Sequence, residues 1–274
     1  MVYLFIFLLG LCVGSFLNVV VYRETQEICD RDSDRDLRKH LPSWIFGKSY
    51  CDNCKKKITW HDNIPLLSFL FLKGRCRFCG KKISLQYPLF EILTAVEFVW
   101  IYWLLTRLSF FGRWEGFYSL ALLIYWFFIF SVSLAIALVD FKIGIIPDAL
   151  LLPAIFASFL RLFITGQWHF LATAFLTSAF FLFLFLVTRG KGLGFGDVKL
   201  GFLIGLVLGW WQRALVAVFL AFLTGAAVGV TLILMGKKKR KEAIAFGPFL
   251  LGGMLAAKIW GDVIWEYYVS LVIK

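Results

Sequence analysis

Charged residues are scarce in this sequence, and long uncharged stretches take their place. Only 17% of the 274 residues are charged, whereas 61% are hydrophobic and 19% are aromatic. A soluble domain is about 45–50% apolar, so the composition excludes an ordinary soluble protein. Runs such as 117–139 and 214–235 carry no charge and exceed the roughly 20 residues that a spanning helix needs. The sequence therefore predicts an all-α polytopic membrane protein.

A cleavable signal is also missing. The first apolar run, 2–22, has no basic n-region and no small-residue cleavage site, so we expect a retained membrane span. Of the 29 Lys and Arg residues, 14 fall between residues 23 and 82, and a second basic block occupies 237–241. The positive-inside rule places both segments in the cytoplasm. Such segments bind anionic membrane lipid, and nucleic-acid binding is not expected.

This rule gives about eight spans in one consistent orientation. They are expected near residues 2–22, 87–106, 117–139, 145–164, 168–188, 198–211, 214–235 and 244–261. The domains are then a first transmembrane helix at 1–22, a cytoplasmic domain at 23–86 and a transmembrane helical domain at 87–274. The sixth span is short, and its glycines at 201, 205 and 209 should let a neighbouring helix approach closely.

Two aspartates lie at the edges of apolar runs. Asp140 follows the uncharged run 117–139, and Asp197 belongs to the segment Gly194-Phe195-Gly196-Asp197. A carboxylate at this depth is costly and marks a functional site. The topology places both at the cytoplasmic face, where two carboxylates in one site would share a proton while one activates water. This is the chemistry of aspartic proteolysis, and glycines 194 and 196 would let a substrate backbone approach.

Four cysteines form the strongest short motif. Cys51 and Cys54 are spaced as Cys-x2-Cys, and so are Cys76 and Cys79. Four thiolates suit a tetrahedral Zn²⁺ site, and they leave no open position for a catalytic water. We therefore expect a structural zinc in the cytoplasmic domain, where the reducing compartment disfavours disulfides.

Further polar residues lie near the same face. Glu91, Asn18 and Arg23 could serve a site there, or could brace and cap helices. Lys199 could tune the Asp197 carboxylate or snorkel, and Asp148 suits a helix N-terminus. Two alternatives place these acids differently. A proton-coupled transporter with a zinc domain would need acids across the bilayer, and a membrane-anchored zinc module would leave the aspartates without a role.

Several ordered motifs resemble one family, the type IV prepilin peptidases of type IV pilus, type II secretion and competence systems. The resemblance covers nearly the whole chain. It rests on 14–23, both cysteine pairs, 62–68, 86–91, Asp140, 146–148, 194–200 and 245–249.

The resemblance implies a bifunctional enzyme of the bacterial inner membrane. It implies an aspartic endopeptidase of the Gly-x-Gly-Asp type, with Asp140 and Asp197 as the catalytic pair. Such enzymes remove the basic leader of prepilins or pseudopilins after a glycine and then methylate the new N-terminal amine with S-adenosylmethionine. The methyltransferase candidates are Glu91, Asn18 and Arg23. The resemblance does not specify the substrate prepilin, the residues that contact S-adenosylmethionine, the oligomeric state or the role of 24–48.

Overall fold

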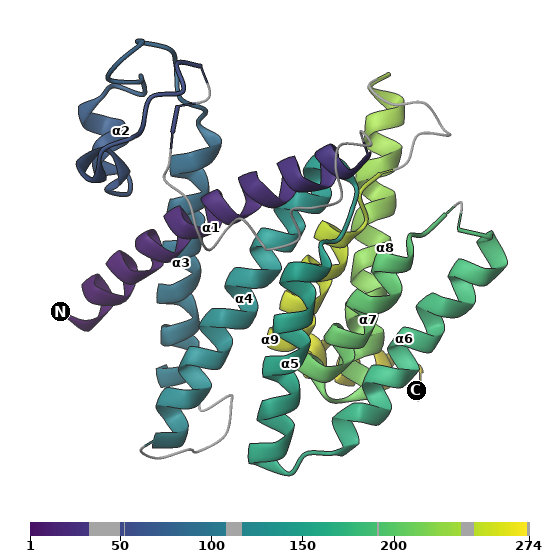
Figure 1. The fold of residues 1–274 in the computed structure, drawn as a ribbon. Coiled ribbons are helices and arrows are strands. Elements are labelled where there is room, and N and C mark those ends of the chain that lie inside the picture. The colour runs from purple at the N-terminus through teal and green to yellow at the C-terminus, as the bar shows by residue number, and fades with distance from the viewer. Residues whose placement is uncertain (33–49, 52, 108–116, 191, 237–243, 273–274) are drawn as a thin grey trace. The chain divides into compact units, whose positions relative to one another are not determined.

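The computed structural model describes residues 1–32, 50–51, 53–107, 117–190, 192–236 and 244–272 (Figure 1). Within these ranges the chain is helical, and its only β-structure is two isolated bridges. The expected all-α fold is confirmed. The elements are α1 (Val2–Asp32), the 3₁₀ turn η1 (Trp60–Asn63), α2 (Leu67–Phe71), α3 (Gln86–Arg107), α4 (Phe117–Ile143), α5 (Asp148–Thr165), α6 (His169–Thr188), α7 (Phe195–Leu208), α8 (Trp211–Leu234) and α9 (Gly247–Val272).

The eight long helices correspond one to one with the expected spans. Six of them, α1, α3, α4, α5, α6 and α8, are long and apolar enough to cross a membrane. Helix α1 continues past the expected end at residue 22, to Asp32. The basic block 237–241, which supported the topology, lies outside the described residues.

The chain divides into two compact units, Met1–Ala135 and Ile136–Lys274. In the first unit, α1 packs along α3 (Figure 1). A Cβ added to Gly14 would lie 2.8 Å from the Glu91 Cα, so the two backbones approach as only glycine allows. The contact places Asn18 beside the first turn of α3, where its Nδ2 donates a hydrogen bond to the Tyr87 carbonyl oxygen at 3.0 Å.

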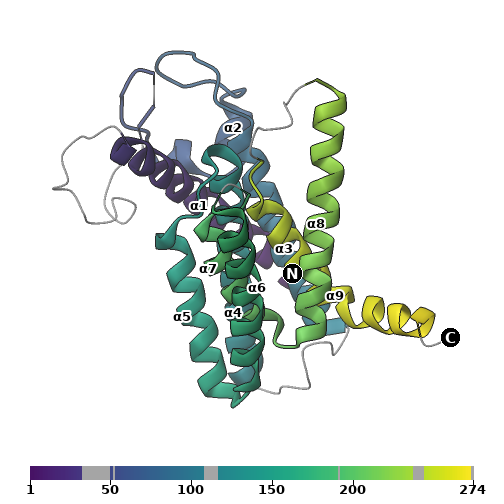
Figure 2. The same cartoon turned by 90° about the vertical axis from the view of Figure 1, so that its right-hand side faces the viewer.

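Helix α7 forms the centre of the second unit. Ten of its 14 residues are buried, and it contacts α5, α6, α8 and α9 (Figure 2). A Cβ on Gly201 would meet the Phe181 ring of α6, and one on Gly205 would meet the Ala174 backbone. The predicted close approach at this glycine spacing is confirmed. The Thr173 hydroxyl of α6 donates to the Gly209 carbonyl oxygen, just beyond the end of α7, at 2.8 Å.

Helices α8 and α9 form the other close pair of the second unit. A Cβ on Gly253 of α9 would clash with the Ala217 carbonyl oxygen of α8. Farther along the pair, Arg213 of α8 forms an ion pair with Asp262 of α9. This packing fixes α9, whose first residue, Gly247, is part of the site described below.

Candidate functional site

The second unit brings the two predicted aspartates together. Asp140 lies near the end of α4 and Asp197 in the first turn of α7, and their exposed fractions are only 4% and 7%. The two carboxylates interact electrostatically. Each accepts one backbone hydrogen bond, Asp140 Oδ2 from the Gly247 N–H at 2.8 Å and Asp197 Oδ2 from the Gly194 N–H at 2.9 Å. Main-chain donors therefore orient both carboxylates.

The sequence around Asp197 explains its position. Gly194 is the N-cap of α7, and the Asp197 N–H donates back to the Gly194 carbonyl oxygen at 3.1 Å. A carboxylate in the first turn of a helix is favoured by the unpaired N–H groups and by the helix dipole. Gly196 has a packing reason of its own, because an added Cβ would lie 3.0 Å from the Ile146 Cβ.

Gly247 is a site residue that the residue-by-residue sequence argument missed. A Cβ added there would lie 2.6 Å from Asp140 Oδ2 and 3.1 Å from its Cγ. A larger residue at this position would therefore force the Asp140 carboxylate to move. The sequence signal for Gly247 is the segment 245–249, one of the motifs that resemble the family.

Lys199 and Asp148 pair with each other. The Lys199 Nζ lies 2.7 and 2.8 Å from the two carboxylate oxygens of Asp148, and this pair is partly exposed. Of the two interpretations of Lys199, tuning of Asp197 has no support in this geometry. Asp148 lies at the N-terminus of α5, as expected, but Pro147 is the N-cap and Asp148 is the first helical residue. Its place in the first turn still suits the helix dipole.

The four cysteines converge in the first unit. The four sulfur atoms all lie within 4.8 Å of one another; they belong to Cys51, Cys54, Cys76 and Cys79. The Cys51 and Cys79 sulfurs are 3.9 Å apart. Tetrahedral zinc with Zn–S bonds of about 2.3 Å separates its sulfurs by about 3.8 Å. The donor set and its spacing therefore fit one Zn²⁺.

Each cysteine pair sits on a similar turn. The Cys51 carbonyl oxygen accepts from the Lys55 N–H at 2.8 Å, and the Cys76 carbonyl oxygen accepts from the Gly80 N–H at 2.9 Å. Lys55 and Gly80 both have positive φ, 55° and 69°. The backbone N–H of Lys81 is the main cause that lowers the pKa of the Cys79 thiol to about 6. This turn therefore favours the thiolate that metal binding requires.

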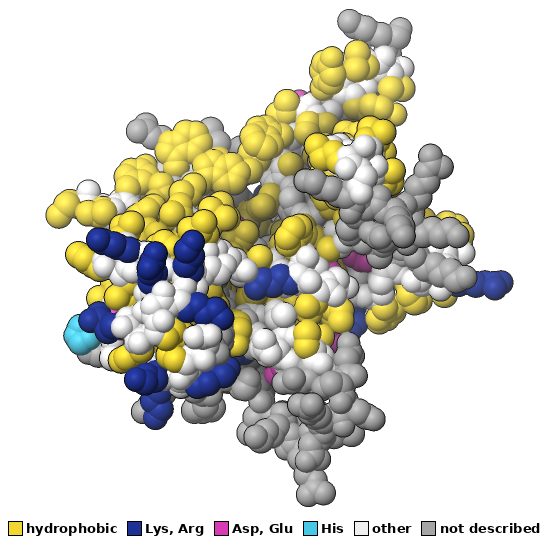
Figure 3. Space-filling view, turned by 90° about the horizontal axis from the view of Figure 1, so that it is seen from above, with side chains coloured by type: hydrophobic (Ala, Val, Ile, Leu, Met, Phe, Trp, Pro, Cys, Tyr) yellow, Lys and Arg dark blue, Asp and Glu magenta, His cyan; other side chains and the backbone are white. Residues whose placement is uncertain are grey.

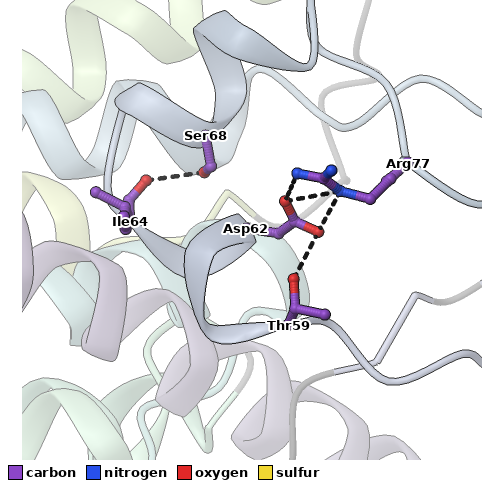
Figure 4. Close-up of polar contacts among 5 residues, drawn as sticks. All are labelled: Thr59, Asp62, Ile64, Ser68 and Arg77. Carbon is purple, nitrogen blue, oxygen red and sulfur yellow. Dashed lines mark hydrogen bonds and ion pairs between the residues drawn. The ribbon is translucent and has the colours of Figure 1, made fainter.

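An ion pair joins the η1 turn, which follows the first cysteine pair, to Arg77, which lies between Cys76 and Cys79 in the second cysteine turn (Figure 4). Asp62, at η1, accepts hydrogen bonds from the Arg77 Nε and Nη2 at 2.6–3.1 Å and from the Thr59 hydroxyl at 3.0 Å. The hydrogen bonds from Arg77 are the main cause that holds the pKa of the Asp62 carboxyl below its usual value, and the hydrogen bond from Thr59 acts in the same direction. The bidentate pair fixes the η1 turn against the second cysteine turn.

A cavity of about 470 Å³ lies in the first unit, between α1, α3 and residues 50–84. Glu91 is in its wall, with an exposed fraction of 8%. The Glu91 Oε2 accepts a hydrogen bond from the Leu66 N–H at 2.9 Å, and the Ser15 hydroxyl also hydrogen-bonds Glu91. Leu66 has φ of 58°, an uncommon conformation for a side chain of this size. The Glu91 side chain therefore holds the strained turn at Leu66 against α3.

Asn18 and Arg23 also line this cavity, together with the Asp62–Arg77 pair. The Asn18 Oδ1 is buried and accepts no hydrogen bond from any described residue. The structure therefore brings all three methyltransferase candidates, Glu91, Asn18 and Arg23, to one cavity.

Comparisons with known proteins match two regions of the chain. Residues 8–105 match the family model described as the bacterial peptidase A24 N-terminal domain, and residues 127–230 match the type IV leader peptidase family. The first match spans the cysteine cluster and the cavity. The second spans both Asp140 and Asp197.

Curated relatives match over almost their entire length. A protein of Aeromonas salmonicida is 34% identical over 98% of this chain and 94% of its own, and one of Legionella pneumophila is 32% identical over the same shares. A Pseudomonas aeruginosa protein is 33% identical over 96% of this chain and 92% of its own. All three are named prepilin leader peptidase/N-methyltransferase. No solved structure matches the chain. Taken with the two domain matches, these relatives show that the chain belongs to the type IV leader peptidase family.

Proposed function

We propose that this protein removes the basic leader of type IV prepilins or pseudopilins after a glycine and then methylates the new N-terminal amine with S-adenosylmethionine. The observation that carries the peptidase half is the interacting, buried pair Asp140 and Asp197, each oriented by a glycine N–H. The relatives that match nearly the whole chain carry both activities in their names.

The carboxylate pair suits peptide hydrolysis. Two interacting carboxyl groups do not both ionise cheaply, so one holds a proton while the other is a carboxylate. The ionised group takes a proton from a water whose oxygen attacks the scissile carbonyl carbon. The protonated group hydrogen-bonds the carbonyl oxygen, and a proton passes to the amine as the C–N bond breaks. The Gly194 and Gly247 N–H groups keep the two carboxylates in place through these steps.

The proposed setting is the bacterial inner membrane. A prepilin would enter with its apolar helix in the bilayer and its basic leader in the cytoplasm. The peptide bond to be cut then lies at the membrane edge, the depth that we assign to Asp140 and Asp197. The proposed domains remain a transmembrane helix at 1–22, a cytoplasmic zinc-binding domain at 23–86 and the transmembrane peptidase domain at 87–274.

The cavity of the first unit is the proposed methyl-transfer site. S-Adenosylmethionine supplies the methyl group as a sulfonium, and a cavity of about 470 Å³ is of the size that binds small molecules. The Asn18 Oδ1, which has no hydrogen-bond partner among the described residues, is an acceptor for the ammonium of the new N-terminus. Glu91 would attract that ammonium and take its proton, leaving the nitrogen lone pair free to accept the methyl group as the bond between methyl carbon and sulfonium sulfur breaks. Arg23 lines the same cavity and is the third methyltransferase candidate.

The cysteine cluster would hold a structural zinc. Cys51, Cys54, Cys76 and Cys79 would bind it as thiolates, and the metal would supply folding free energy to a domain with a small core. Four sulfur ligands leave no position for a reacting group, so the zinc is assigned to folding and not to either reaction.

One experiment tests both halves. Purified full-length enzyme in detergent is given a prepilin and methyl-labelled S-adenosylmethionine, and cleavage and label transfer are followed by mass spectrometry. We expect both products, with no cleavage by Asp140→Asn or Asp197→Asn. The matched control is Asp262→Asn, which removes a carboxylate of the same unit that is paired with Arg213. Cleavage by either aspartate variant at the wild-type rate would refute the assignment.

A further inference from the structure

The short helix α2 has two unlike faces. One face of the helix and its flanking residues line the cavity, through Leu66, Ser68, Phe69 and Leu72. The opposite face carries Leu67, Leu70 and Phe71, whose exposed fractions are 53%, 68% and 83%. Three neighbouring large apolar side chains exposed on one helix face are the kind of patch that marks an interaction surface. We call Leu67, Leu70 and Phe71 the outer face of α2.

The segment that carries this face is strongly basic. Residues 50–85 contain eight Lys and Arg and only two Asp. Lys73 and Arg75 follow α2 directly, and both are exposed. The described aspartate, Asp62, is already paired with Arg77. Figure 3 shows the Lys and Arg side chains gathered beside hydrophobic ones on this module. The charge complements an anionic surface.

The module is tied to the bilayer on both sides. Helices α1 and α3, which flank it in the sequence, contain the candidate spans Val2–Cys29 and Gln86–Thr106. Leu85 and Leu89, at the entry to the second span, have exposed fractions of 72% and 57%. Because the module is held close to the membrane, the effective concentration of lipid at its surface is high. A soluble partner has no such advantage.

We propose that the outer face of α2 lies in the headgroup–acyl boundary of an anionic bilayer, with Lys73 and Arg75 at lipid phosphates. Exposed apolar residues flanked by Lys and Arg are the pattern of interfacial anchors. Docking would make α2 the wall between the bilayer and the cavity. A cavity placed this way would face the surface where a membrane-anchored N-terminus emerges, and this last consequence rests on the proposed function.

Hydrogen exchange tests the docking with the full-length protein. The protein is compared in detergent, in phosphatidylcholine nanodiscs and in phosphatidylglycerol nanodiscs, and amide exchange is read for residues 64–73. We expect exchange about tenfold slower in phosphatidylglycerol than in detergent or phosphatidylcholine. The double variant Leu70→Ser with Phe71→Ser should lose this protection, and Lys73→Gln should reduce it. The conservative variant Phe71→Trp, which keeps an interfacial aromatic, should retain it.

These substitutions remove exposed side chains, and unchanged exchange in α1 and α3 checks that the first unit stays folded. Equal protection in all three environments would overturn the proposal, since the outer face would then be covered by protein. Equal exchange in the two nanodiscs, or protection that survives the double serine variant, would also overturn it. If the protein shows the lipid-dependent protection but does not methylate its substrate, the proposed function is contradicted and the proposal of lipid docking stands.

Discussion

Substituting Gly247 with Ala should disable the peptidase through the position of Asp140. The new Cβ would start 2.6 Å from Asp140 Oδ2, and an ordinary contact begins at 3.4 Å, so the carboxylate must shift by about 0.8 Å. A shift of this size also disturbs the 2.8 Å hydrogen bond from the Gly247 N–H, which depends on both distance and angle. A misplacement of about 1 Å in a catalytic group costs about 100-fold in rate, equivalent to about 2.7 kcal/mol of transition-state stabilisation.

The assay is leader cleavage of a prepilin at several substrate concentrations, compared with methylation of a pre-cleaved substrate. Gly247→Ala should reduce kcat/KM for cleavage by about 100-fold and leave methylation near the wild-type rate. Gly252→Ala is the matched control, because it lies in the same helix and its Cβ would meet nothing within 4 Å. Cleavage by Gly247→Ala within twofold of this control would refute the argument.

Other predictions test the remaining assignments. Asp140→Ala and Asp197→Ala should each abolish cleavage and leave methylation of a pre-cleaved substrate largely intact, because neither carboxylate can perform both roles; near wild-type cleavage by one variant would exclude the pairing. Elemental analysis should find one zinc per chain, and Cys51→Ser should loosen residues 50–85 in hydrogen exchange and impair methylation; active enzyme without zinc would contradict the site. Glu91→Gln keeps an oxygen acceptor for the Leu66 N–H but removes the base. It should cleave normally and methylate poorly, and equal loss of both activities would favour a purely structural glutamate.

The sequence predicted those features that local pattern determines. The uncharged runs predicted the long helices, and the Cys-x2-Cys spacing predicted the thiol cluster. The limits of the apolar runs placed Asp140 and Asp197 near helix ends, and their cytoplasmic orientation stays a prediction of the charge rule. Each of these depends on the spacing of residues close in the chain or on composition.

Contacts between distant residues could not be read in the same way. Asp140 meets Gly247 across 107 residues, and Lys199 meets Asp148 across 51. Nothing in the local sequence of Lys199 distinguishes Asp148 from the much nearer Asp197, so the chosen partner depends on the packing of α5 against α7. Glu91 likewise combines a place in the cavity wall with a hydrogen bond to Leu66, and the sequence left its structural and catalytic interpretations open.

The length of α7 has a consequence for where peptide cleavage takes place. A helix of 14 residues is about 21 Å long, about 9 Å short of the hydrocarbon thickness of a bilayer. The Thr173 hydroxyl satisfies the Gly209 carbonyl oxygen at the far end of α7, so that end can stop inside the protein without reaching water. We predict that the shortfall falls at the far end, which would keep Asp197 at the membrane edge. A threonine at the opposite end of the helix would then help to set the depth of the bond that is cut.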